Sequence, residues 1–168
     1  MEPALAPQLT KDQHVLLGEL VEILGMTDGM MITTVHHFNP QAAAAMRGAF
    51  IPTFIRTWAR AVRGSTVDAD LLKLVVFVEK KMKEIADARN DFIHGLFVGD
   101  YVSAGYVNPG YQTTSAVAFR SGERRQTNEL PDLRERAALV SCVVAHIDHC
   151  IKSNDPSRWL DRVKPLLA

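Results

Sequence analysis

A long amphipathic pattern dominates the middle of the chain. Between residues 68 and 96 helix-forming residues prevail. This segment has no proline, and its one glycine is Gly95. Apolar side chains recur there with a four-three spacing, at Leu71, Val75, Val78, Met82, Ile85, Phe92 and Leu96. Such a spacing places one apolar stripe on one face of a helix. The pattern predicts a central helix of roughly 28 residues, about 40 Å long, that ends near the glycine.

The N-terminal third predicts two shorter helices. Thr10 and Gln13 have the spacing of a capping box at a helix start. The helix that follows is expected to stop at Gly25, and Asp28 is expected to cap a second helix that runs to about Phe38.

The next segment contains clear start signals. Asn39 followed by Pro40 predicts a cap and a proline in the first turn of an alanine-rich helix. Pro52 should kink that helix or split it in two, because proline cannot continue the backbone hydrogen-bond ladder. Ser65 or Asp68 is expected to cap the central helix.

The pattern changes after the central helix. Residues 101–107 and 113–119 are rich in Tyr, Val, Thr and Ala, and Asn108-Pro109-Gly110 separates them. This predicts a small β-hairpin or a long extended loop as an insertion over residues 101–120. A further helix is expected from about Glu129 to Ser153, followed by a last short helix.

These elements predict an all-α fold, a helical bundle with one long central helix and the hairpin or loop insertion. At 168 residues the chain is expected to form a single domain over residues 1–168, with residues 1–9 as a loose tail. No run of about 20 apolar residues occurs, so no membrane segment is expected. With two cysteines and no signal peptide, we expect a cytoplasmic protein with free thiols.

One position breaks the apolar stripe of the central helix. Continuing the spacing requires an apolar residue at position 89, yet Arg89 stands there. A guanidinium on a buried stripe is costly unless it reaches a partner, a cleft or a subunit boundary. Asn90 and His94 follow and share one face of the helix. Around the helix axis, His94 lies about 140° from Arg89.

Arg89, Asn90 and His94 form an Arg-Asn-x-x-x-His motif near the end of a long amphipathic helix. This motif resembles that of the HEPN superfamily, in which His follows Arg after four to six residues, often with a polar residue straight after the Arg. The motif covers six residues, and the architectural likeness extends from Asp68 to the C-terminus. The resemblance implies a helical bundle that forms a homodimer. Active members of the family are metal-independent endoribonucleases, many of them toxins, and other members are inactive binding or scaffold modules.

The resemblance implies roles for the three residues. Arg89 would bind the scissile phosphate of RNA, His94 would act as general acid or base, and Asn90 would orient the histidine or the phosphate. Two protomers would bring two motifs to one cleft, with no cofactor and no metal. Two alternatives remain open. The motif is structural, or the chain is an interaction or regulatory module whose partner is a protein antitoxin or regulator.

A second basic group offers an RNA-binding surface. Arg56, Arg60 and Arg63 fall at i, i+4 and i+7, on one face of a predicted helix. They could face phosphates, or they could simply be a solvated helix face. The chain has 19 Lys and Arg against 19 Asp and Glu. This balance argues against a constitutive nucleic-acid coat protein but permits a local basic cleft.

A third cluster has the spacing of metal ligands on a helix. Cys142, His146 and Cys150 recur every four residues. One helix rarely supplies three ligands to a single metal, because successive turns diverge from a common point. We therefore interpret the cluster as buried packing at a helix–helix contact.

Overall fold

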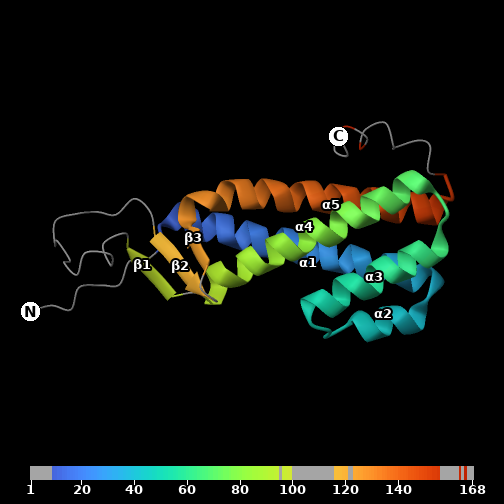
Figure 1. The fold of residues 1–168 in the computed structure, drawn as a ribbon, viewed down its shortest axis with the longest axis horizontal. Coiled ribbons are helices and arrows are strands. Elements are labelled where there is room, and N and C mark those ends of the chain that lie inside the picture. The colour runs from blue at the N-terminus through green and yellow to red at the C-terminus, as the bar shows by residue number, and fades with distance from the viewer. Residues whose placement is uncertain are drawn as a thin grey trace, which may run out of the picture. The chain divides into compact units, whose positions relative to one another are not determined.

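The protein is built mainly from α-helices, as Figure 1 shows for its computed structural model. The structure describes residues 9–94, 96–99, 116–120 and 123–155, together with residues 163 and 165. In chain order its elements are α1 (Lys11–Phe38), α2 (Pro40–Met46), α3 (Ile51–Ser65), α4 (Ala69–His94), β1 (Leu96–Gly99), β2 (Ala116–Arg120), β3 (Glu123–Gln126), the 3₁₀ turn η2 (Thr127–Glu129) and α5 (Leu130–Ser153). The predicted predominance of helices is confirmed.

Contacts divide the chain into two compact units. Unit 1 comprises Met1–Val21 with Asp87–Glu135, and unit 2 comprises Glu22–Ala86 with Arg136–Ala168. Helices α1, α4 and α5 each contribute residues to both units.

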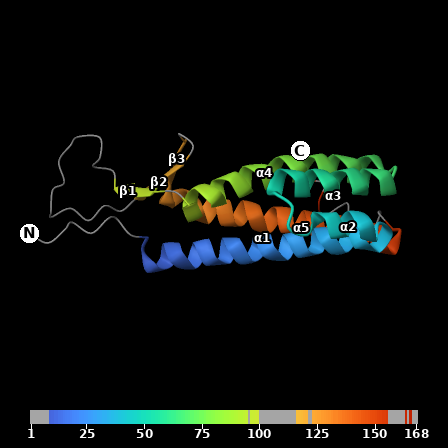
Figure 2. The ribbon, with the colours of Figure 1, turned by 90° about the horizontal axis from the view of Figure 1, so that it is seen from below.

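The described part of unit 2 is a helical bundle. The stripe of α4 forms much of its core, since Leu71, Val75, Val78, Met82 and Ile85 are each 3% exposed or less. Other helices add further buried residues: Leu24, Met31, Val35, Trp58, Val62, Val140, Val144 and Ile147. Two polar contacts join neighbouring helices, which Figures 1 and 2 show side by side. Thr34 Oγ1 donates to Asp148 Oδ1 at 2.7 Å between α1 and α5, and Arg63 pairs with Glu79 between α3 and α4.

Unit 1 contains a small antiparallel sheet. Its strand order is β1-β2-β3, with Leu96 of β1 opposite Phe119 of β2. The first turns of α1 contact the start of η2, because Gln13 Nε2 donates to Thr127 Oγ1 at 2.9 Å. An ion pair of 2.8 Å between Glu19 and Arg134 joins α1 to α5.

The predicted insertion is only partly covered by the structure. Strand β2 overlaps the second of the two predicted extended segments, residues 113–119. The first segment, 101–107, and the turn at 108–110 lie outside the described residues. The described partners of β2 are β1 and β3, which the sequence analysis had not assigned to strands. Residues 1–8 of the expected N-terminal tail and nearly all of the expected last helix also lie outside the described residues.

The predicted helix starts are confirmed where a side chain caps the backbone. Thr10 N donates to Gln13 Oε1 at 2.8 Å and Gln13 N donates to Thr10 Oγ1 at 3.2 Å, which is the capping box. Asn39 Oδ1 accepts from the backbone of α2 at 3.0 Å. Asp68 Oδ1 accepts from the N–H groups of Asp70 and Leu71, at 3.0 and 2.8 Å, and so caps α4.

The break expected after the alanine-rich run is also confirmed. Helix α2 ends at Met46 and α3 begins at Ile51, with Pro52 in its first turn. Gly48, with φ of 77°, makes the link in the left-handed backbone region that other residues rarely adopt.

The break expected at Gly25 is wrong. Helix α1 continues for 28 residues through Gly25, Asp28 and Gly29. A glycine inside a helix costs about 1 kcal/mol relative to alanine. The buried positions Leu20, Leu24, Thr27, Met31, Thr34 and Val35 keep helical phase across the break. Burial of that continuous face outweighs the weak glycine signal.

No helix among the described residues is long and apolar enough to cross a membrane.

Candidate functional site

The candidate site lies in the last turns of α4, within unit 1. Arg89 is half-buried, and so it is more exposed than the apolar residues of the stripe that it continues. Its Nη1 donates to Asn90 Oδ1 at 2.9 Å, so the two neighbouring side chains turn toward each other. The structure therefore brings together two of the three residues that the motif predicts.

Arg89 also carries an unpaired donor. Its Nε is buried and has no hydrogen-bond partner among the described residues. A buried N–H without a partner costs about 1–3 kcal/mol. Such a group in a native protein requires an explanation, and an anion that arrives from outside would satisfy it.

His94 is the last residue of α4. Its side chain lies outside the described part of the structure, so the expected approach of His94 to Arg89 stays a prediction. Helical periodicity places His94 one turn beyond Asn90 on the same face. Asn90 is thus the motif residue that lies beside both of the others along the helix.

Asp91 lies outside the motif that the sequence predicts. Its side chain is 6% exposed, among the few buried charged groups of the described residues. It lies one turn after the buried Ala88 and directly before the buried Phe92. A carboxylate beside an apolar stripe was the available signal, because such a group is rarely buried without partners.

The three predicted RNA-binding arginines lie on α3, in unit 2, and all three are exposed. They differ in their partners. Arg63 forms an ion pair with Glu79, whereas Arg56 and Arg60 have no hydrogen bond or ion pair among the described residues. Two of the three guanidinium groups are therefore available to an external anion.

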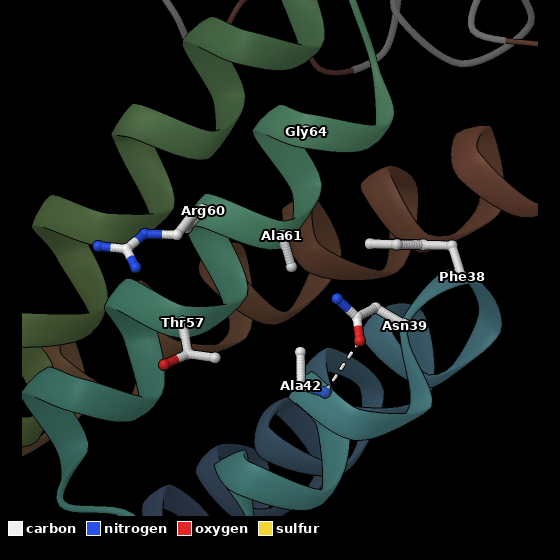
Figure 3. Close-up of a pocket in the computed structure, with 7 residues that line it drawn as sticks. All are labelled: Phe38, Asn39, Ala42, Thr57, Arg60, Ala61 and Gly64. Atoms are coloured by element: carbon white, nitrogen blue, oxygen red, sulfur yellow. Dashed lines mark hydrogen bonds between the residues drawn. The ribbon is translucent and has the colours of Figure 1, made fainter.

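A pocket of about 430 Å³ opens between α2 and α3 in unit 2. It is lined by Phe38, Asn39, Ala42, Thr57, Arg60, Ala61 and Gly64. Figure 3 shows the Ala42 and Ala61 methyl groups pointing toward each other from the two helices. The Asn39 carbonyl is held by the Ala42 N–H, which leaves the Asn39 amide nitrogen facing the pocket. Sequence reasoning missed this site because its walls come from segments that share no motif.

The Cys142-His146-Cys150 cluster does not converge. Cys142 is exposed, whereas His146 and Cys150 are buried with the Cys150 Sγ 3.5 Å from His146 Nε2. Burial lowers the pKa of His146, and the charge of His149 lowers it further. No group of three or more His, Cys, Asp or Glu side chains in the described ranges could hold a metal ion.

The two thiols should therefore react very differently. Burial, together with the charges of Asp155 and Asp68, raises the pKa of Cys150 to about 11. At pH 8 its thiolate is about a thousandfold less abundant than its thiol, and only the thiolate is nucleophilic. Iodoacetamide at pH 8 is expected to label Cys142 alone in the folded protein and both cysteines in urea, as measured by peptide mass spectrometry. Equal labelling of both without urea would contradict the buried environment of Cys150.

No protein-family model matches the chain, and neither a curated protein nor a solved structure matches it.

Proposed function

We propose that the chain is a HEPN-like helical protein that cleaves RNA without a metal, with Arg89 and His94 as its reacting groups. The observation that carries the proposal is the buried Arg89 Nε, which has no partner among the described residues and lies beside the Asn90 contact. An always-charged guanidinium with an unsatisfied donor suits a phosphodiester, whose oxygens accept two parallel hydrogen bonds.

The reaction that these residues fit is transesterification within the RNA strand. A base removes the proton of a ribose 2′-hydroxyl, and the 2′-oxygen attacks the adjacent phosphorus. The bond to the 5′-oxygen breaks, and that oxygen takes a proton from an acid. His94 supplies acid or base, since an imidazole titrates near neutral pH, and Arg89 stabilises the charge that grows on the phosphate oxygens. The products are a 2′,3′-cyclic phosphate and a 5′-hydroxyl.

The same proposal includes a homodimer in which two motifs share one cleft. One motif supplies a single imidazole, whereas the reaction needs both a base and an acid. A second copy would supply the other histidine. Such an enzyme would act on RNA in the cytoplasm, where Cys142 and Cys150, both free thiols, stay reduced.

The test is RNA cleavage by the purified protein in excess EDTA. The parent protein is expected to cut a single-stranded RNA and to leave 2′,3′-cyclic phosphate ends. His94→Ala is expected to lower the rate at least about 100-fold, within the range typical of general acid–base catalysis. His36→Ala is the matched control, because His36 is exposed in the last turn of α1.

Two results would contradict the proposal. One is a parent protein that cuts no RNA, and the other is a His94→Ala protein that cuts as fast as the His36→Ala control. Circular dichroism of each variant shows whether a lost activity reflects a lost fold.

The second candidate is a non-catalytic interaction or regulatory module that binds a protein antitoxin or regulator. Such a module would use exposed apolar side chains as contacts, and Phe50 is 87% exposed and Val67 98% exposed. Residues 101–119 would add a contact segment, and most of them lie outside the described residues. A protein that cuts no RNA yet binds a partner through Phe50 would fit this candidate.

A further inference from the structure

The pocket between α2 and α3 has an apolar methyl group on each of its two helices. Ala42 on α2 and Ala61 on α3 face each other across it, and the Thr57 methyl group lies on the α3 side (Figure 3). Phe38 adds an aromatic ring at the α2 end. Methyl groups on two sides and an aromatic ring suit contact with the face of a planar, weakly polar ring.

The pocket is also lined by three polar side chains, those of Asn39, Thr57 and Arg60. The Asn39 amide nitrogen faces the interior and has two N–H donors, while its oxygen is occupied by the Ala42 N–H at 3.0 Å. The Asn39 amide therefore offers a donor to a ligand carbonyl. Uracil has carbonyl groups at its edge and two apolar faces, so it fits both features.

A phosphate-binding group stands at the rim. Arg60 lines the pocket with its stem, and Figure 3 shows its guanidinium extending away from the interior. The side chain is exposed and has no hydrogen bond or ion pair among the described residues, so it can turn to a phosphate outside the pocket. Arg56 lies one turn earlier on the same face of α3 and is also exposed.

We infer that this pocket binds one base of a single-stranded RNA, while Arg60 and Arg56 hold the adjacent phosphates. The inference takes its ligand class from the proposed function and names how the substrate is held. Base stacking and phosphate contact are separate contributions here, so each can be removed alone.

The test measures binding without cleavage. The probes are a fluorescein-labelled 2′-O-methyl hexauridylate, which lacks the attacking hydroxyl, and a hexamer of abasic 2′-O-methyl units with the same number of phosphates. Fluorescence anisotropy of the full chain in EDTA gives both affinities. The parent protein is expected to bind the uridine probe about tenfold more tightly than the abasic probe.

Two pairs of variants separate the two contributions. Ala42→Phe fills the pocket and is expected to bring the two affinities together, while Ala45→Phe, on the exposed side of the same helix, leaves the tenfold preference intact. Arg60→Gln is expected to lower the affinity for both probes equally, by several fold. It should also reduce the salt dependence of that affinity by the amount expected for about one phosphate contact. Arg47→Gln removes an exposed arginine outside the pocket and should have a smaller effect.

The outcomes distinguish this inference from the proposed function. A preference for uridine that Ala42→Phe removes supports the pocket even if the protein cuts no RNA. Cleavage of RNA with equal affinity for both probes would overturn the pocket and leave the proposed function standing. If Ala42→Phe fails to fold by circular dichroism, Thr57→Phe fills the same pocket from the α3 wall, and a tenfold preference retained in that variant overturns the inference as well.

Discussion

Arg89→Met is expected to abolish RNA cleavage and to stabilise the folded protein. Under the proposed function, cleavage should fall at least about 100-fold, because methionine keeps the apolar stem but removes the charge that would face the phosphate. Stability should rise because Met continues the apolar stripe of α4 and removes a buried Nε that has no partner among the described residues. The two effects have opposite signs because the guanidinium would be retained for catalysis at a cost to the fold.

The expected gain is about 1 kcal/mol, which raises the melting temperature by about 3 °C in a chain of this size. Lys83→Met is the matched control, since Lys83 is an exposed cation on the same helix. That variant should change neither the cleavage rate nor the melting temperature by much. A lower melting temperature for Arg89→Met would show that the guanidinium holds the structure together, and the structural interpretation of the motif would then be correct.

Helix starts could be predicted from the sequence where a nearby side chain caps the helix by a hydrogen bond. Thr10 with Gln13, Asn39 before Pro40, and Asp68 each place a side-chain acceptor next to helix N–H groups that lack partners. Both partners lie within three residues, so the local sequence determines the contact whatever the rest of the chain does. The same reasoning explains why the central helix starts where the sequence places its start.

Helix ends predicted only from the low helix propensity of a residue were less reliable. Gly25 weakens a helix by about 1 kcal/mol, which is less than the burial of one leucine side chain stabilises it. Leu24 and Met31 are buried on either side of Gly25, and their phase favours one continuous helix. The phase of the apolar positions across the glycine was the better predictor.

The candidate site could be predicted only in part, for a physical reason. Arg89 stood out because it breaks a pattern that its own helix defines, and its contact with Asn90 is also local. The pocket between α2 and α3 depends on Asn39 and Ala61, which are distant in sequence and meet through packing. Small residues such as Ala61 carry no chemical signal on their own. Their role appears once the opposite wall is known.

Trp58→Ala is expected to destabilise unit 2 by about 3–5 kcal/mol, which is a large part of the stability of an ordinary domain. Trp58 is fully buried and is the largest of the fully buried side chains among the described residues, so alanine would leave a large cavity. Phe50→Ala is the matched control, because this aromatic side chain is 87% exposed and its loss should cost less than about 0.5 kcal/mol. Urea unfolding followed by circular dichroism gives both values.

Trp58→Phe separates the packing of the ring from its polar atom. The Trp58 Nε1 is buried without a hydrogen-bond partner among the described residues, and this costs about 1–3 kcal/mol. Phenylalanine removes that donor and keeps most of the apolar ring. The stability lost with the smaller buried ring and the stability gained by removing the unpaired N–H should nearly cancel. We expect a change of less than about 1.5 kcal/mol for Trp58→Phe, against several for Trp58→Ala. Equal losses for the two variants would mean that the indole N–H finds a partner in solution and that Trp58 stabilises the protein through it.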